Sequence, residues 1–282
     1  MISIFIFAGT SEGREISESL SQKGYSCTVS VATEYGAGLL PKAENLTILQ
    51  GRLDSRKMTD LFLEKDYSCV IDATHPFATA VSKEIKKACL LSQLPYLRFA
   101  RATASSAGGE QEAAALSSVF FFQDMETAAN WLESQDGGIF VSTGSKELPF
   151  LSQKISKKAR LFVRVLPAEE SLKICASCKI PPEHIIAMQG PFSQEQNEAH
   201  FTRSGAKILL TKESGKRGGY FEKIRAAEKM GMRVAVIRNP ESSKNAESLK
   251  NPEKRERYFS SIKEILAWVE REMRLENTKG LF

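Results

Sequence analysis

The first residues able to do chemistry lie in a turn near the start of the chain, ISIFIFAGTSEGRE, where an apolar run over residues 2–7 precedes two glycines. Gly9 can adopt backbone angles closed to other residues, and Gly13 permits close approach of a ligand or of a sheet. Thr10 and Ser11 add hydroxyl and N–H groups at a helix N-terminus, which favours phosphate. A dinucleotide fingerprint has three glycines, so the turn predicts a nucleotide site with a plain strand–helix corner as the alternative.

The end of the next apolar run, VSVATEYGAG, bears on which nucleotide is bound. An acid about 20 residues after the glycines binds the ribose diol of NAD, and Glu34 could do so. Alternatively, Ser30 and Thr33, with Arg14 or Arg52 close by, could accept the 2′-phosphate of NADPH. Glu34 is equally compatible with a solvated loop, so the choice stays open.

Two more segments, GRLD at 51–54 and DATHPF at 72–77, end strands that face the same crevice. Gly51 would allow close approach of an adenosine. The small residues after Asp72 leave room for ribose and nicotinamide. His75 precedes Pro76, which favours extended geometry, so its ring could donate a proton or bind the cofactor by a hydrogen bond.

The second half of the chain carries a matching set of glycine-containing strand ends, STGSKEL, AMQGPF and LTKESGKRGG. Lys146, Lys212, Lys216 and Arg217 would make this side positive, which suits a substrate with several carboxylates. The alternative is a set of solvated surface cations, and it applies best to Lys216 and Arg217.

The elements that position these residues alternate along the chain. Strands are predicted at 2–7, 27–31, 46–49, 69–72, 96–99, 119–122, 139–142, 161–165, 185–188, 208–211 and 234–237. Helices are predicted at 12–23, 55–65, 78–92, 124–134, 169–175, 194–203, 219–230 and 258–274. Continuous rather than alternating apolarity indicates strands buried on both faces, as in parallel sheets covered by helices.

This alternation predicts an α/β protein with two Rossmann-like, doubly wound domains, parallel sheets and an interdomain cleft. The predicted domains are 1–101, which binds the dinucleotide, and 119–282, which binds the substrate and includes the last helix. Residues 102–118 are low in large apolar groups and are predicted to connect them, and the polar stretch 239–254 is predicted to be a loop.

The composition suits a folded protein that binds a small anion. The 282 residues are 42% hydrophobic, and 39 Lys+Arg against 34 Asp+Glu give a formal net charge of +5. No dense basic block with interleaved aromatics occurs, which argues against nucleic acid. No stretch approaches the roughly 20 apolar residues of a membrane span, and no signal peptide is evident. We therefore expect a cytoplasmic protein that has no membrane partner. The sequence does not predict its oligomeric state.

The five cysteines include one C-x-x-C spacing, Cys175 and Cys178. No second such pair follows and no His pair lies nearby at zinc-finger spacing. We expect an ordinary helix C-terminus there and no metal site.

A series of segments, taken in chain order, resembles the precorrin-6A reductase and cobalt-precorrin-6A reductase family of cobalamin biosynthesis: GTSEGRE, VSVATEYGAGLLP, GRLD, DATHPFA, PYLRFAR, STGSKEL, LFVRVLP, IIAMQGPFS and LTKESG. The likeness runs from Ile2 to about Pro240, and DATHPFA followed by AMQGPFS is its most specific part. The resemblance implies an NAD(P)H-dependent oxidoreductase acting on CH–CH groups, with NADH or NADPH as cofactor and an anionic tetrapyrrole as substrate. Hydride would go to one carbon of a C=C bond and a proton to its neighbour, giving (cobalt-)precorrin-6B.

On this hypothesis the site residues fall into groups. The pyrophosphate is held by Gly9, Thr10, Ser11, Gly13 and Arg14; Ser30, Thr33, Gly51 and Arg52 flank the adenosine; Asp72, Ala73, Thr74 and Pro76 border the nicotinamide. The substrate is bound by Thr143, Gly144, Ser145, Lys146, Gln189, Gly190, Lys212, Glu213, Ser214 and Gly215. His75 and Lys212 are the candidate proton donors or supporting polar groups. Two other functions stay open, an NAD(P)-sensing binding protein without turnover and a two-domain nucleotide-sugar transferase.

Overall fold

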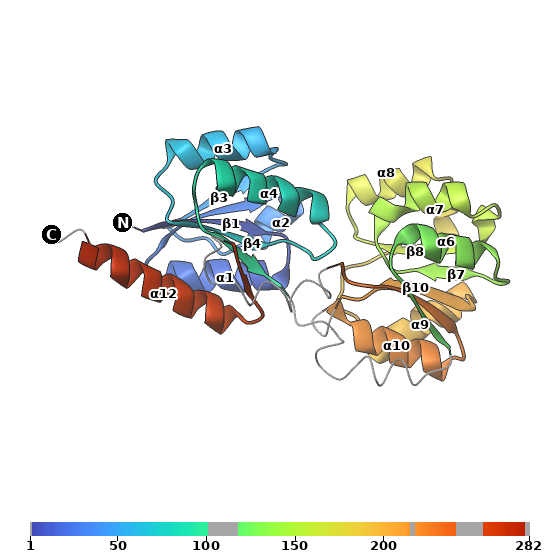
Figure 1. The fold of residues 1–282 in the computed structure, drawn as a ribbon. Coiled ribbons are helices and arrows are strands. Elements are labelled where there is room, and N and C mark those ends of the chain that lie inside the picture. Colours follow the sequence, from blue (N-terminus) through green and yellow to red (C-terminus); the bar gives the residue numbers. More distant parts are fainter. Residues whose placement is uncertain (1, 101–117, 215–217, 241–255, 280–282) are drawn as a thin grey trace. The chain divides into compact units, whose positions relative to one another are not determined.

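The computed structural model describes residues 2–100, 118–214, 218–240 and 256–279, which form two units (Figure 1). The first unit consists of residues 2–100 together with 256–279, and the second of the described residues between 118 and 240. Each unit contains one six-stranded parallel sheet with helices on both faces. The predicted fold class of two parallel-sheet α/β domains is therefore confirmed.

The first sheet has the order β12-β5-β4-β1-β2-β3, and every pairing is parallel. Its strands are β1 Ser3–Ala8, β2 Ser26–Val31, β3 Leu46–Gln50, β4 Cys69–Ala73, β5 Tyr96–Phe99 and β12 Glu256–Phe259. Its helices are α1 Ser11–Gln22, α2 Glu34–Gly38, α3 Ser55–Glu64, α4 Thr79–Leu91 and α12 Ile262–Lys279. The first five strands follow the Rossmann order 3-2-1-4-5, and β12 takes the place of the sixth.

Strand β1 is buried on both faces, as its continuous apolarity predicts. Ile4 and Ile6 belong to one core cluster, with α1 and α12, while Phe5 and Phe7 belong to another, with α3 and α4. Figure 1 shows the same division, with α1 and α12 below the sheet and α3 and α4 above it.

The second sheet has the order β6-β11-β10-β7-β8-β9, again parallel throughout. Its strands are β6 Val119–Phe122, β7 Ile139–Val141, β8 Leu161–Val165, β9 Ile185–Ala187, β10 Ile208–Lys212 and β11 Arg233–Ile237. Its α-helices are α6 Met125–Glu133, α7 Leu148–Lys154, α8 Glu169–Ser177, α9 Gln194–Ser204 and α10 Tyr220–Lys229, with 3-10 turns η2 Ser145–Glu147, η3 Lys158–Arg160 and η4 Pro182–His184. Strands β7 to β11 repeat the order 3-2-1-4-5, and the sixth strand, β6, precedes them in the chain.

The assignment of the C-terminal segment to the second domain is wrong. Strand β12 pairs with β5 of the first sheet in the register Glu256↔Tyr96 to Phe259↔Phe99. Helix α12 begins only at Ile262, and its Ile265, Trp268 and Val269 are buried in the core of the first unit. The physical reason is twofold. Strand β12 pairs with the edge of β5, and the apolar side of the amphipathic helix α12 covers apolar side chains of α1 and the sheet. The predicted connection 102–118 lies outside the described residues except for Ser118, as does the predicted loop after Pro240.

None of the helices in the described ranges combines the length and the apolarity that crossing a membrane requires.

Candidate active site

The first candidate site lies where β1 and β4 run side by side. From these neighbouring strands the chain continues to β2 on one side and to β5 on the other, so they mark the switch point at which such sheets bind ligands. Residues 9–14 follow β1 and residues 74–77 follow β4, so both predicted cofactor segments meet at this edge.

Thr10 fixes the corner between β1 and α1. As the N-cap of α1, its Oγ1 accepts the N–H of Gly13 at 3.1 Å and donates to the carbonyl of Ala73 at 2.9 Å. This hydroxyl thus ties the helix start to β4. The start of α1 at this corner is the positive end of the helix, which favours a phosphate.

The two glycines of the corner have different roles. A Cβ at position 13 would lie 2.9 Å from the Cα of Ala8 and 3.3 Å from the Cβ of Ala73, so Gly13 is required for the helix to pack on the sheet. Gly9 is not among the described glycines with positive φ, and a Cβ there would be 3.9 Å from the Cα of Thr74. The expectation that Gly9 uses angles closed to other residues is therefore wrong; Gly51, with φ +124°, is the position that does.

Asp72 lies in a buried network rather than at the surface of a cofactor site. Its Oδ1 accepts from Thr74 N at 3.0 Å, Thr74 Oγ1 at 2.7 Å and Arg98 Nη1 at 2.7 Å. Its Oδ2 accepts from Ser82 Oγ and Tyr96 OH, each at 2.7 Å. Burial, then the charge of Asp72, raises the pKa of Tyr96. Asp72 therefore acts through Thr74, whose backbone it orients at the ligand edge.

His75 sits half-buried just after Thr74. Its Nδ1 accepts the N–H of Phe77 at 3.3 Å, which assigns the proton of the neutral ring to Nε2. Nε2 is thus the ring atom that carries the proton.

The residues predicted around the adenosine follow β2 and β3, which are neighbours in the sheet. Ser30 is buried within β2, and Thr33 caps α2, with its Oγ1 accepting from Gly36 N at 3.1 Å. Arg52 and Glu34 are exposed. The exposure of Glu34 and Arg52 is compatible with both the NADH and the NADPH alternatives.

In the second unit the corresponding switch point lies between β7 and β10. Ser142 Oγ donates to the carbonyl of Leu210 at 3.0 Å, which joins the two strand ends. Gly144, with φ +87°, begins η2, and Lys212 Nζ forms an ion pair of 2.6 Å with Glu147 of this turn. Lys212 is therefore held at the strand end by a carboxylate.

The other predicted substrate residues divide by exposure. Lys146 and Gln189 are exposed, and Ser214 donates to the carbonyl of Gly218 at 3.3 Å. Glu213 is buried and accepts the N–H of Asn239 at 2.9 Å, so its carboxylate joins β10 to β11. Gly215, Lys216 and Arg217 lie outside the described residues.

Comparison with known proteins identifies the family. Residues 3–270 match the family model described as precorrin-6x reductase CbiJ/CobK. The chain belongs to this family. It is 32% identical over 239 residues to the cobalt-precorrin-6A reductase of Priestia megaterium, covering 84% of this chain and 90% of the relative. It is also 32% identical over 249 residues to that of Methanothermobacter thermautotrophicus, covering 88% and 80%. A solved structure, CobK precorrin-6A reductase, superposes with a TM-score of 0.68 at 20% identity, covering 96% and 97%, and supports the fold.

Membership of the precorrin-6x reductase family makes this chain an oxidoreductase of cobalamin biosynthesis, as the segment series predicts. The family is named for reducing precorrin-6, a tetrapyrrole substrate.

Sequence reasoning missed two buried cations of the second unit, Arg164 in β8 and Lys223 in α10. Each stands in an apolar pattern, within LFVRV and YFEKI, where a charge is out of place. A charged residue within such an apolar pattern is the sequence signal that could have identified both side chains.

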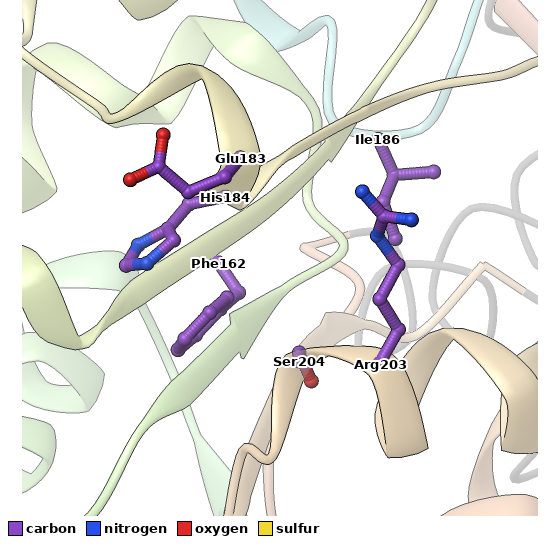
Figure 2. Close-up of a pocket in the computed structure, with 6 residues that line it drawn as sticks. All are labelled: Phe162, Glu183, His184, Ile186, Arg203 and Ser204. Atoms are coloured by element: carbon purple, nitrogen blue, oxygen red, sulfur yellow. The ribbon is translucent and has the colours of Figure 1, made fainter.

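The second unit also contains a small pocket (Figure 2). It is lined by Phe162, Glu183, His184, Ile186, Arg203 and Ser204. Turn η4 precedes β9 and Ser204 ends α9, so the pocket lies towards the amino ends of the strands. The His184 ring fills part of the pocket, because it stacks on the Phe162 ring with 4.0 Å between the two ring centroids. Ligands of such sheets bind at the opposite, carboxyl ends.

All five cysteines are free and buried. Cys178 is the C-cap of α8, which confirms the interpretation of the C-x-x-C as a helix C-terminus. Within the described ranges, no group of three or more His, Cys, Asp or Glu side chains is placed to hold a metal ion.

Proposed function

We propose that this chain reduces one C=C bond of precorrin-6A, or of its cobalt-containing form, using NADH or NADPH, and so forms the corresponding precorrin-6B. The observation that carries the proposal is the β1–α1 corner, which presents a tightly packed helix N-terminus at a Rossmann switch point in a member of a reductase family.

The residues at this corner fit a dinucleotide. Because Gly13 lets α1 pack against Ala8 and Ala73, the positive end of α1 lies at the sheet edge, where a pyrophosphate would bind. Arg14 would add a cation. A reduced nicotinamide supplies the hydride when bound.

The other groups of the first unit would complete this site. Ser30, Thr33, Gly51 and Arg52 would flank the adenosine, and Ala73, Thr74 and Pro76 would border the nicotinamide, with Thr74 held by Asp72. His75 would hold a proton at Nε2 for delivery to the carbon beside the one that accepts hydride.

The second unit would bind the anionic tetrapyrrole. Residues 143–146, Gln189, Gly190, Lys212 and Ser214 would contact it at the edge near β7 and β10. Thr143 supports this because its Oγ1 is buried with no hydrogen-bond partner in the described part of the chain, and a bound substrate would supply one. A cytoplasmic site of action belongs to the same proposal.

The test is anaerobic incubation with NADH or NADPH and either form of the substrate, following the absorbance of the reduced nicotinamide. We expect one equivalent of cofactor to be oxidised per equivalent of precorrin-6B formed. No oxidation with either cofactor and either substrate would refute the proposal, and binding of the dinucleotide without turnover would favour the sensor alternative.

A further inference from the structure

Two cationic side chains lie buried near the carboxyl end of the second sheet, and neither forms an ion pair with a carboxylate of the described residues. Arg164 is the next-to-last residue of β8, and Lys223 is the fourth residue of α10, the helix that follows β10. Each is only 7% exposed. Both thus lie near the edge where ligands of such a sheet bind.

Arg164 has only neutral partners. Its Nη1 donates to Asn197 Oδ1 at 2.9 Å and lies 3.0 Å from His200 Nδ1, and its guanidinium lies over the Phe192 ring at 3.9 Å. No carboxylate in the described ranges lies within ion-pair distance of this guanidinium. Burial lowers the pKa of Arg164 to about 10.

Lys223 is on the buried stripe of α10 with Tyr220, Ile224 and Ala227. Across the part of the chain that the structure describes, its ammonium has no hydrogen-bond or ion-pair partner. Burial, then the charge of Arg164, lowers the pKa of Lys223 to about 7. The Glu222 carboxylate raises the pKa of Lys223 but forms no ion pair with Lys223 among the described residues. Glu222 Oε2 is itself buried and has no hydrogen-bond partner in the same residues.

The start of α10 lies at the same place, where the positive end of the helix meets the Glu222 carboxylate of its first turn, whose Oε2 would lie 3.9 Å from a Cβ at Gly219. Gly219, with φ +65°, is the N-cap of α10 and offers no side-chain hydrogen bond to the first-turn N–H groups. Phe192 connects this helix start to Arg164, because a Cβ at Gly219 would lie 3.7 Å from the Phe192 carbonyl.

Such an arrangement is costly for the free protein. Burying a charge costs several kcal/mol unless an opposite charge and hydrogen bonds compensate, and two like charges add repulsion. A carboxylate ligand would supply both the charge and the acceptor atoms.

We propose that Arg164, Lys223 and the first turn of α10 form a site for one carboxylate group of the substrate. This inference rests on the proposed function, since it names the group that the second unit holds. It also links the AMQGPF segment to the substrate: a Cβ at Gly190 would lie 3.0 Å from the Phe192 ring, so glycine there lets this ring stay under the guanidinium.

The test compares Lys223→Met with the control Lys229→Met in the full chain. Lys229 is on the same helix but is 65% exposed and pairs with Glu198, so its loss should matter little. The probe is tricarballylate, a small tricarboxylate, at constant ionic strength, with its neutral trimethyl ester as the ligand control. The measurements are the shift in Tm with each probe, the Kd for precorrin-6A and the Kd for NADPH.

We expect tricarballylate but not the ester to raise the Tm of the parent and of Lys229→Met. Lys223→Met should lose this rise and bind precorrin-6A about tenfold more weakly, with NADPH affinity within about twofold of the parent, because one charged hydrogen bond is lost at the substrate alone. Its Tm without ligand should equal or exceed that of the parent, since an unpaired buried charge is removed; should it fail to fold, Lys223→Gln serves in its place.

A full tricarballylate response in Lys223→Met, or none in the parent, would overturn the inference. A response that depends on Lys223 in a protein that does not reduce precorrin-6A would support the carboxylate site while refuting the proposed function.

Discussion

Replacing Asp72 by Asn tests whether the buried network at the end of β4 stabilises the first unit. Asp72 is fully buried, and its partner Arg98 is 1% exposed with Nη1 at 2.7 Å from Oδ1. Asn keeps the shape but removes the charge, and its NH₂ cannot accept a hydrogen bond. The guanidinium then stays buried but loses its ion pair with the Asp72 carboxylate.

Breaking one side of a buried ion pair costs about 3–5 kcal/mol, a large part of the roughly 5–15 kcal/mol that stabilises a domain. We expect Asp72→Asn to lower the free energy of unfolding of the first unit by about this amount. The chain has two tryptophans, and Trp268 is buried in this unit. Urea unfolding followed by fluorescence in a Trp131→Phe background would therefore report on the first unit alone.

The double variant Asp72→Asn with Arg98→Met separates the charge effect from packing. Because it removes both members of the ion pair, it should be less destabilised than the sum of the two single variants by more than about 1 kcal/mol. Additive losses, or an Asp72→Asn variant within about 1 kcal/mol of the parent, would refute the reasoning.

Three further predictions concern single positions. Gly13→Ala places a Cβ 2.9 Å from the Cα of Ala8, so it should lower the free energy of unfolding by about 1–3 kcal/mol. It should also raise the Kd for NADPH without changing the Kd for precorrin-6A. Unchanged NADPH binding in titrations would contradict this prediction. Lys212→Ala should weaken substrate binding more than cofactor binding. Glu147→Gln removes the carboxylate that pairs with Lys212 at 2.6 Å, and this variant should retain substrate binding. Equal weakening of substrate and cofactor binding in Lys212→Ala would assign Lys212 a structural role. Lys223 has a pKa of about 7 in the folded protein, against its ordinary value of 10.5. Between these pH values the unfolded chain binds more protons than the folded protein. The free energy of unfolding therefore rises with pH in this range, by at most about 5 kcal/mol. The stability advantage of Lys223→Met should therefore shrink from pH 7 to pH 9 in urea titrations, and a constant difference would contradict the burial of a neutral amine.

Most strands could be predicted because burial on both faces leaves a continuous apolar run, as in Ile139–Val141 and Leu161–Val165. Strand β12 could not, because ERYF is short and directly precedes a helical pattern. Its partner β5 lies far away in the sequence, and no local periodicity reports such a pairing. Helices α2 and α7 were also missed, since neither is long enough to show a clear amphipathic period.

The site could be predicted as a set of strand ends but not as a set of contacts. Chain order placed Thr10 and Asp72 at one sheet edge, which the pairing of β1 with β4 confirms. It could not show that the Thr10 hydroxyl is used by Ala73, or that Asp72 points to Arg98. Hydrogen-bond partners across strands depend on side-chain direction, which the residue type alone does not give.

The C-terminal segment bears on the cofactor end of the first unit through a chain of contacts. Strand β12 covers the edge of β5, and its Glu256 and Tyr258 accept hydrogen bonds from Lys86 of α4 at 2.8 and 2.5 Å. Strand β5 carries Arg98, which pairs with Asp72, and Asp72 orients the backbone beside the nucleotide corner. Excluding water strengthens the attraction within an ion pair, so the edge strand that covers β5 beside Arg98 should also strengthen its pairing with Asp72. The residues that shape this edge of the first sheet therefore come from both ends of the chain, and the glycine-containing corner alone could not predict them.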